Sequence, residues 1–175
     1  MRCRYYPVVR AKRILACVVV ALVVITGSAT AHVQKKDDPD DWSDQLDIKT
    51  ARLSHTDTRL VVGIHAWQDW STRALADRTI WFTLDTKGGN AADFGININK
   101  GNDGLQCLVT TEPNGEFVAN GRARRDGTNG ASCSFKRSDV AAAGSKTIRW
   151  HASVYNLSTF EHDDAPDSGM VSHHI

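Results

Sequence analysis

Apolar and polar residues alternate along most of the chain, and this period of two predicts β-strands. The pattern is clearest where Leu60, Val62, Ile64 and Ala66 occupy every second position. It recurs near residues 46–48, 80–84, 94–99, 105–109, 117–125, 131–136 and 148–154. Asn-Gly and Asp-Gly pairs between several of these segments are typical of hairpin turns. We therefore expect about eight strands.

Two stretches, residues 70–77 and 138–143, do not alternate and predict short helical turns. Ser138 suits the N-cap of the second turn, and Gly144 suits its end. The chain shows no internal repeat and no sign of a second domain. The expected fold is all-β: a single antiparallel β-sandwich over residues 46–160 with one or two helical turns.

The first 31 residues have the pattern of an export signal. Five basic residues precede an apolar run over residues 14–25, and Ala29-Thr30-Ala31 suits a cleavage site. The run is shorter than the roughly 20 residues that a membrane-spanning helix needs. We expect a secreted protein that begins at His32 and has no membrane span. Its parts would be an acidic lead-in arm (32–45), the β-domain (46–160) and a polar tail (161–175).

Removal of the leader changes the charge balance. The leader holds five of the 21 basic residues and none of the 20 acidic ones, so the remainder is mildly acidic. Such a protein is not expected to bind nucleic acid, because the negatively charged phosphates of nucleic acid bind to basic surfaces. The basic group Arg122, Arg124 and Arg125 is expected to be a solvated strand or turn.

Two cysteines, Cys107 and Cys133, remain after cleavage, each in a strand-like run. In an oxidising compartment they are expected to form a disulfide. The alternative is a pair of buried free thiols.

Short motifs follow one another in a recognisable order. They are Leu46-Asp47-Ile48, Arg59-Leu60-Val61, the loop at residues 84–88, Arg149-Trp150, and the tail from Asp163 to Gly169. This order resembles that of small secreted β-sandwich proteins of unknown function from high-GC Gram-positive bacteria. The resemblance implies a sandwich fold and no activity. Lys87 stands where those proteins often carry Asp.

Acidic residues gather in three places: the lead-in, the loop near residue 90 and the tail. Calcium prefers several oxygen ligands from such segments. Because a lead-in and a tail can meet at one edge of a sandwich, the clusters could complete one site. We expect a structural calcium site, whose candidate ligands are Asp38, Asp40, Asp47, Asp85 and Asp93. Lys87 inside the loop argues against the last two, and solvated Asp-rich turns are the alternative.

Aromatic residues suggest a second kind of site. Trp150 shares a face with Ile148 and Ala152 and is expected in the core. If the second and third strands pair, His65, Trp67 and Trp81 would share one patch. Flat aromatic surfaces suit sugar rings, so this patch could bind an extracellular glycan or cell-wall component. The alternative is that another segment covers these side chains.

His32 supports a rival hypothesis, a copper-dependent oxidative enzyme or a copper carrier. An N-terminal His resembles the copper-chelating residue of lytic polysaccharide monooxygenases and small copper carriers. A second ligand would come from His55, His65 or His151, since imidazole suits copper. Residues 33–37, however, are expected to be an arm rather than a strand, and the tail pair His173-His174 at best a weak metal scavenger.

Common catalytic motifs of hydrolases and phosphate-binding enzymes are absent from the sequence. We therefore favour a secreted, non-catalytic binding module over an enzyme.

Overall fold

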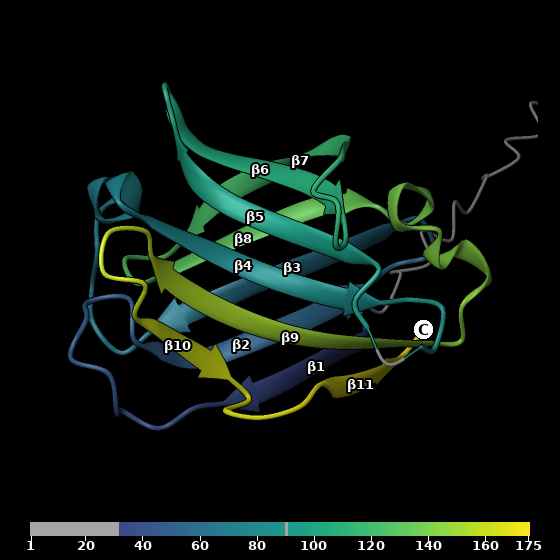
Figure 1. Cartoon of the computed structure of the whole chain (residues 1–175), viewed down its shortest axis with the longest axis horizontal. Helices are drawn as coiled ribbons and strands as arrows, with labels where there is room; N and C mark the ends of the chain where they lie inside the picture. Colours follow the sequence, from purple (N-terminus) through teal and green to yellow (C-terminus); the bar gives the residue numbers. More distant parts are fainter. Residues whose placement is uncertain (1–31, 90) are drawn as a thin grey trace, which may run out of the picture.

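The computed structural model describes residues 32–89 and 91–175, so the expected export signal lies outside the described residues. Within them, the protein is all-β (Figure 1). The strands are β1 (His32–Asp37), β2 (Ile48–His55), β3 (Arg59–Ala66), β4 (Arg78–Asp85), β5 (Phe94–Gly101), β6 (Gly104–Thr111), β7 (Phe117–Asp126), β8 (Gly130–Lys136), β9 (Thr147–Asn156), β10 (His162–Ala165) and β11 (Val171–His174). The helical turns are short 3₁₀ segments at Thr72–Ala76, Arg137–Val140 and Ala142–Gly144. In the described ranges, we find no helix with the length and apolar character needed to cross a membrane.

All strand pairs are antiparallel, in the order β1-β2-β3-β8-β7-β6-β5-β4-β9-β10, and β11 also pairs with β9. Strand β7 joins the two halves, because its first half pairs with β6 and its second half with β8. The result is one continuous and nearly closed sheet (Figure 1). The all-β prediction is thus confirmed, whereas the prediction of an eight-stranded sandwich is wrong.

Each of the eight segments that alternate in sequence forms a strand, β2 to β9. Their apolar stripes point inward, as in β3, where Leu60, Val62, Ile64 and Ala66 are fully buried. Trp150 is buried as expected, and its ring centroid lies 6.1 Å from that of Phe82. Burying each such large side chain stabilises the fold by roughly 1.5–3 kcal/mol, so this core dominates stability.

The three additional strands come from the polar ends of the chain. Residues 33–37, expected to be an arm, belong to β1, which pairs with β2 along its whole length. Strands β10 and β11 are built from the tail and both pair with β9. The arm prediction is wrong because an edge strand forms through backbone hydrogen bonds and needs no apolar stripe.

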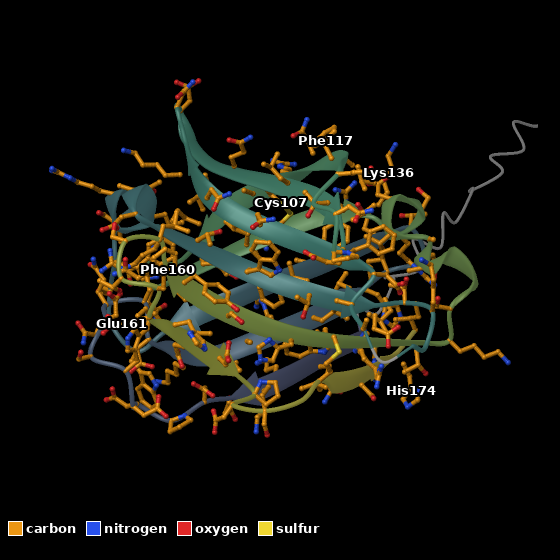
Figure 2. All side chains as sticks on the ribbon, in the orientation of Figure 1. Cys107, Phe117, Lys136, Phe160, Glu161 and His174 are labelled. Carbon is orange, nitrogen blue, oxygen red and sulfur yellow. A yellow bond between two sulfur atoms is a disulfide. The ribbon has the colours of Figure 1, made fainter. Side chains whose placement is uncertain are left out.

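The expected disulfide is present between Cys107 and Cys133, with a Cα–Cα distance of 6.0 Å. Cys107, labelled in Figure 2, lies in β6 and Cys133 in β8, so the bond crosses over β7. It passes Gly121, where a Cβ would lie closer than 3.0 Å to both sulfur atoms. A glycine is therefore needed at this crossing. The alternative of two free thiols is wrong.

The two edges of the sheet meet along a line that we call the seam. On one side lie β1 and β2, and on the other β10 and β11 (Figure 1). At one point the backbone N–H of Ile48 donates a hydrogen bond of 2.6 Å to Oδ2 of Asp163. The seam thus joins residues 115 positions apart in sequence.

Candidate metal centres

Four carboxylates meet at one end of the seam. Asp38 follows β1, Asp47 precedes β2, Asp163 lies in β10, and Asp41 comes from the connection between β1 and β2. One oxygen from each lies within 4.8 Å of the others. We call these four residues the aspartate cluster. The expected meeting of lead-in and tail is therefore observed.

Three members of the cluster are almost completely buried: Asp38 is 5 % exposed, Asp47 1 % and Asp163 7 %. Both carboxylate oxygens of Asp38 and Oδ1 of Asp47 have no hydrogen-bond partner among the described residues. None of the four carboxylates forms an ion pair within the described ranges. Buried oxygens of this kind are costly unless a cation or a proton neutralises them.

The pKa values of the buried aspartates reflect the same cost of burying their charge. Burial, followed by the charge of Asp163, raises the pKa of Asp38 to about 8. Burial also raises the pKa of Asp47 to about 7, although the N–H of Trp42 opposes this change. The pKa of Asp163 is raised for the same first reason, against the hydrogen bond from Ile48. Without a cation, the cluster holds protons at pH values where ordinary aspartates are ionised.

The loop residues expected to share this site lie elsewhere. Asp85 pairs with Arg149 and accepts the backbone N–H groups of Lys87 and Gly88. Burial acts to raise the pKa of Asp85, but these donors outweigh it and lower the pKa. Asp93 also has a lowered pKa and binds Lys87, whose Nζ lies 3.1 Å from Oδ1. Both carboxylates are thus already satisfied by protein donors.

Asp40 lies beside the aspartate cluster without belonging to it, and its carboxylate adds to the causes that raise the pKa of Asp47. The sequence-based ligand set thus contained two cluster members, Asp38 and Asp47. Asp41 and Asp163 were missing from the set, although both lie in the acidic segments that drew attention to the site.

Three imidazoles meet at the other end of the seam. His32 begins β1 and His55 ends β2, and the two residues are direct partners across the pair. His173 reaches them from β11. We call these residues the histidine cluster. Of the ligands proposed to accompany His32, only His55 is there: His65 binds Asn129 near Asp126, and His151 lies next to Pro166 and Asp164.

The structure does not form the expected aromatic patch. Strand β3 pairs with β2 and β8, whereas β4 pairs with β5 and β9, so Trp67 and Trp81 lie apart. Trp67 is 39 % exposed, with Nζ of Lys49 4.7 Å from its ring centroid. Trp81 packs edge-on against Tyr155, with the two ring centroids 6.5 Å apart. Glycan binding stays a prediction, without the shared surface that motivated it.

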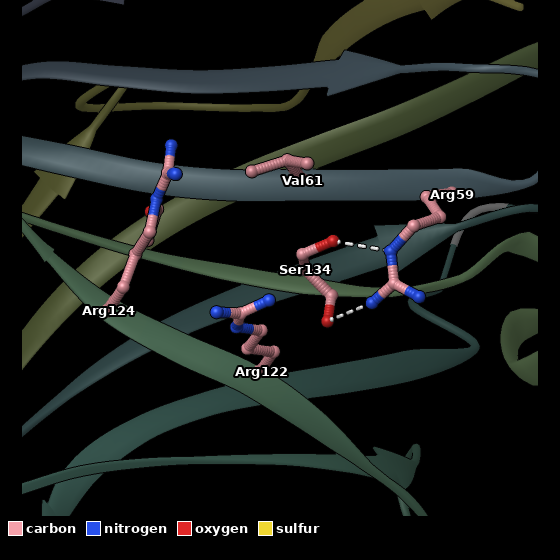
Figure 3. Close-up of a pocket in the computed structure, with 6 residues that line it drawn as sticks. Arg59, Val61, Arg122, Arg124 and Ser134 are labelled. Atoms are coloured by element: carbon pink, nitrogen blue, oxygen red, sulfur yellow. Dashed lines mark hydrogen bonds between the residues drawn. The ribbon is translucent and has the colours of Figure 1, made fainter.

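A cleft of about 470 Å³ lies outside the strands β3, β8 and β7 (Figure 3). Arg59, Arg122 and Arg124 line it, and Arg59 donates two hydrogen bonds to Ser134. The basic segment is thus a strand, as expected. A cleft with three guanidinium groups attracts anions.

Comparisons with models of known families, with curated proteins and with solved structures found no match to this chain. The class of the protein is therefore defined by its fold and clusters alone. It is an all-β, disulfide-closed protein whose sheet seam carries one oxygen-rich and one nitrogen-rich cluster.

Proposed function

We propose that this protein is an exported β-domain that binds a calcium ion through Asp38, Asp41, Asp47 and Asp163. The observation that carries the proposal is the burial of three of these carboxylates with unpartnered oxygens on Asp38 and Asp47. A divalent cation would neutralise charge that no described basic side chain neutralises through an ion pair.

The donor set favours calcium over softer metals. All four ligand atoms are carboxylate oxygens, which hard cations prefer, and calcium tolerates irregular and bidentate arrangements. Oxygens on opposite sides of a calcium ion lie about 5 Å apart, which suits the 4.8 Å spread of the cluster. Outside the cell, calcium reaches the millimolar concentrations at which weak extracellular sites fill. The disulfide is compatible with such a location.

The ion would hold the two sides of the seam together. Its ligands come from the start of the described chain, the segment before β2 and strand β10. Holding them together would keep the polar edge strands on the sheet. We therefore propose a binding module whose edges are completed by calcium, without a catalytic step.

Calcium is expected to raise the melting temperature of chelator-treated protein. At a free concentration 100 times the Kd, the added stability is about 2.7 kcal/mol, or roughly 5–10 °C for a domain of this size. The double variant Asp38→Asn/Asp47→Asn should lose at least half of this shift. Differential scanning calorimetry with and without millimolar calcium measures it.

The variant should also be no less stable than the natural protein in chelator, because its amides carry no charge to bury. Asp103→Asn, an exposed change between β5 and β6, is the matched control and should keep the full shift. A missing shift in the natural protein, or an undiminished one in the double variant, would refute the calcium site.

Metal-free protein is expected to lose stability as the pH rises from 6.5 to 8. The folded protein still binds a proton at Asp38, whose pKa is raised to about 8, while the unfolded chain has released it. Stability then falls by up to about 1.4 kcal/mol per pH unit, or about 2 kcal/mol over this window.

Below pH 6.5 the histidine cluster opposes this trend. Burial, and then His55, lowers the pKa of His173 to about 4, so stability rises with pH up to the ordinary histidine value. The upper part of the window from pH 6.5 to 8, where the unfolded histidines have lost most of their protons, therefore reports mainly the aspartates in urea unfolding. The fall should disappear in saturating calcium and in Asp38→Asn/Asp47→Asn. A flat profile in metal-free natural protein would contradict the prediction.

A further inference from the structure

The histidine cluster holds three imidazole rings in mutual contact. Ring centroids lie 5.9 Å apart for His32 and His55, 5.5 Å for His32 and His173, and 5.0 Å for His55 and His173. Nδ1 of His55 lies 2.8 Å from Nε2 of His173. One ring nitrogen from each residue lies within 4.8 Å of the other two. Three strands, two of them in direct register, fix this arrangement.

The rings differ in exposure in a way that suits a site with an open side. His173 is fully buried and its Nδ1 has no partner among the described residues. His55 is half-buried and His32 is exposed. An ion held by the three would be covered from the His173 side and accessible from the His32 side.

The electrostatic surroundings set this cluster apart from three other histidines of the described chain. His65, His151 and His162 each lie 3.6–3.7 Å from a carboxylate that would stabilise a protonated ring. Within the described ranges, none of the three clustered imidazoles has such an ion pair. Neutral imidazole is the form that ligates metals.

We propose that His32, His55 and His173 bind one transition-metal ion of the Cu²⁺ or Zn²⁺ class. Imidazole nitrogens around a tetrahedral zinc ion lie about 3.3 Å apart, a value between the 2.8 Å of the His55–His173 pair and the 4.8 Å that bounds all three ligand nitrogens. The three rings supply nitrogen ligands only. The site therefore prefers a different class of metal ion from the aspartate cluster at the other end of the seam. The fourth position faces solvent on the side of His32. Cleavage after Ala31 would add the α-amino group of His32 to the ligands.

The test is isothermal titration of metal-free, exported protein with CuCl₂ and, separately, ZnCl₂, with the N-terminus identified by mass spectrometry. Millimolar calcium is present throughout so that the aspartate cluster is not available to the added metal. One equivalent of at least one of the two ions should bind. His32→Ala and His55→Ala should each weaken the affinity more than about 100-fold, a larger loss than that of an outer-shell partner.

His174→Ala is the matched control, because His174 neighbours His173 but is exposed and hydrogen-bonds to Thr147. This variant should bind the ion as the natural protein does. Because His32 is exposed, its substitution leaves the fold intact, and circular dichroism checks this. A Kd above about 10 µM for both ions would overturn the proposal. So would His32→Ala and His55→Ala variants that bind the ion with the affinity of the natural protein. Neither outcome affects the calcium melt, so the two sites are tested independently.

Discussion

Replacing Trp150 with alanine is expected to lower the free energy of unfolding by about 4 kcal/mol. Trp150 is fully buried in β9, opposite Leu84 of β4 and Val171 of β11, with its ring near Phe82. Truncation removes a large apolar surface and leaves a cavity that the surrounding strands can fill only in part. Urea unfolding followed by circular dichroism measures the change.

Trp150→Phe provides the matched comparison. It keeps an aromatic ring but removes the indole N–H, which has no partner among the described residues. Losing a buried unsatisfied donor offsets part of the lost packing, so we expect a cost below about 1.5 kcal/mol. If Trp150→Ala were within about 1 kcal/mol of the natural protein, Trp150 would not be a central core residue.

Removing the disulfide is expected to cost about 3.5 kcal/mol, since the bond joins positions separated by 26 residues. The bond restricts the unfolded chain, and its loss lets that chain gain entropy. Cys107→Ala/Cys133→Ala should therefore melt roughly 7–14 °C lower than the oxidised protein. Calorimetry of both proteins, with and without dithiothreitol, measures the difference.

Reductant should lower the melting temperature of the natural protein by a similar amount and leave the double variant unchanged. A reductant effect of equal size in the double variant would show that the shift has another origin. Equal melting temperatures for the oxidised protein and the variant would contradict the expected stabilisation.

The strands of the core could be predicted because their signal is local. In β3 and β4 every second side chain is apolar, and this period alone specifies a half-buried strand. The pairing of those strands is not local. β3 and β4 are consecutive in sequence, yet β3 pairs with β8 and β4 with β9. The prediction that Trp67 and Trp81 share one patch was wrong for this reason.

The two clusters depend on even longer connections. The acidic composition of the lead-in and tail indicated calcium, but which carboxylates meet depends on contacts across the seam, such as the one between Ile48 and Asp163. From the sequence, His173 was interpreted only as half of a tail pair that is at best a weak metal scavenger. Its burial comes from the pairing of β11 with β9, where it lies opposite Ile148. Edge strands without an apolar stripe give no periodic signal, so the residues that they bring to a site cannot be predicted from sequence patterns.

The link between β9 and β10 exposes two large apolar side chains. Phe160, labelled in Figure 2, is 80 % exposed there, and Leu157 is 56 % exposed. Asp163 and His173 both lie beyond this link, each in a different cluster. Breaking one peptide bond here would separate one member of each cluster from the rest of the covalent chain, and both would then be held only by pairing with β9 and by contacts across the seam.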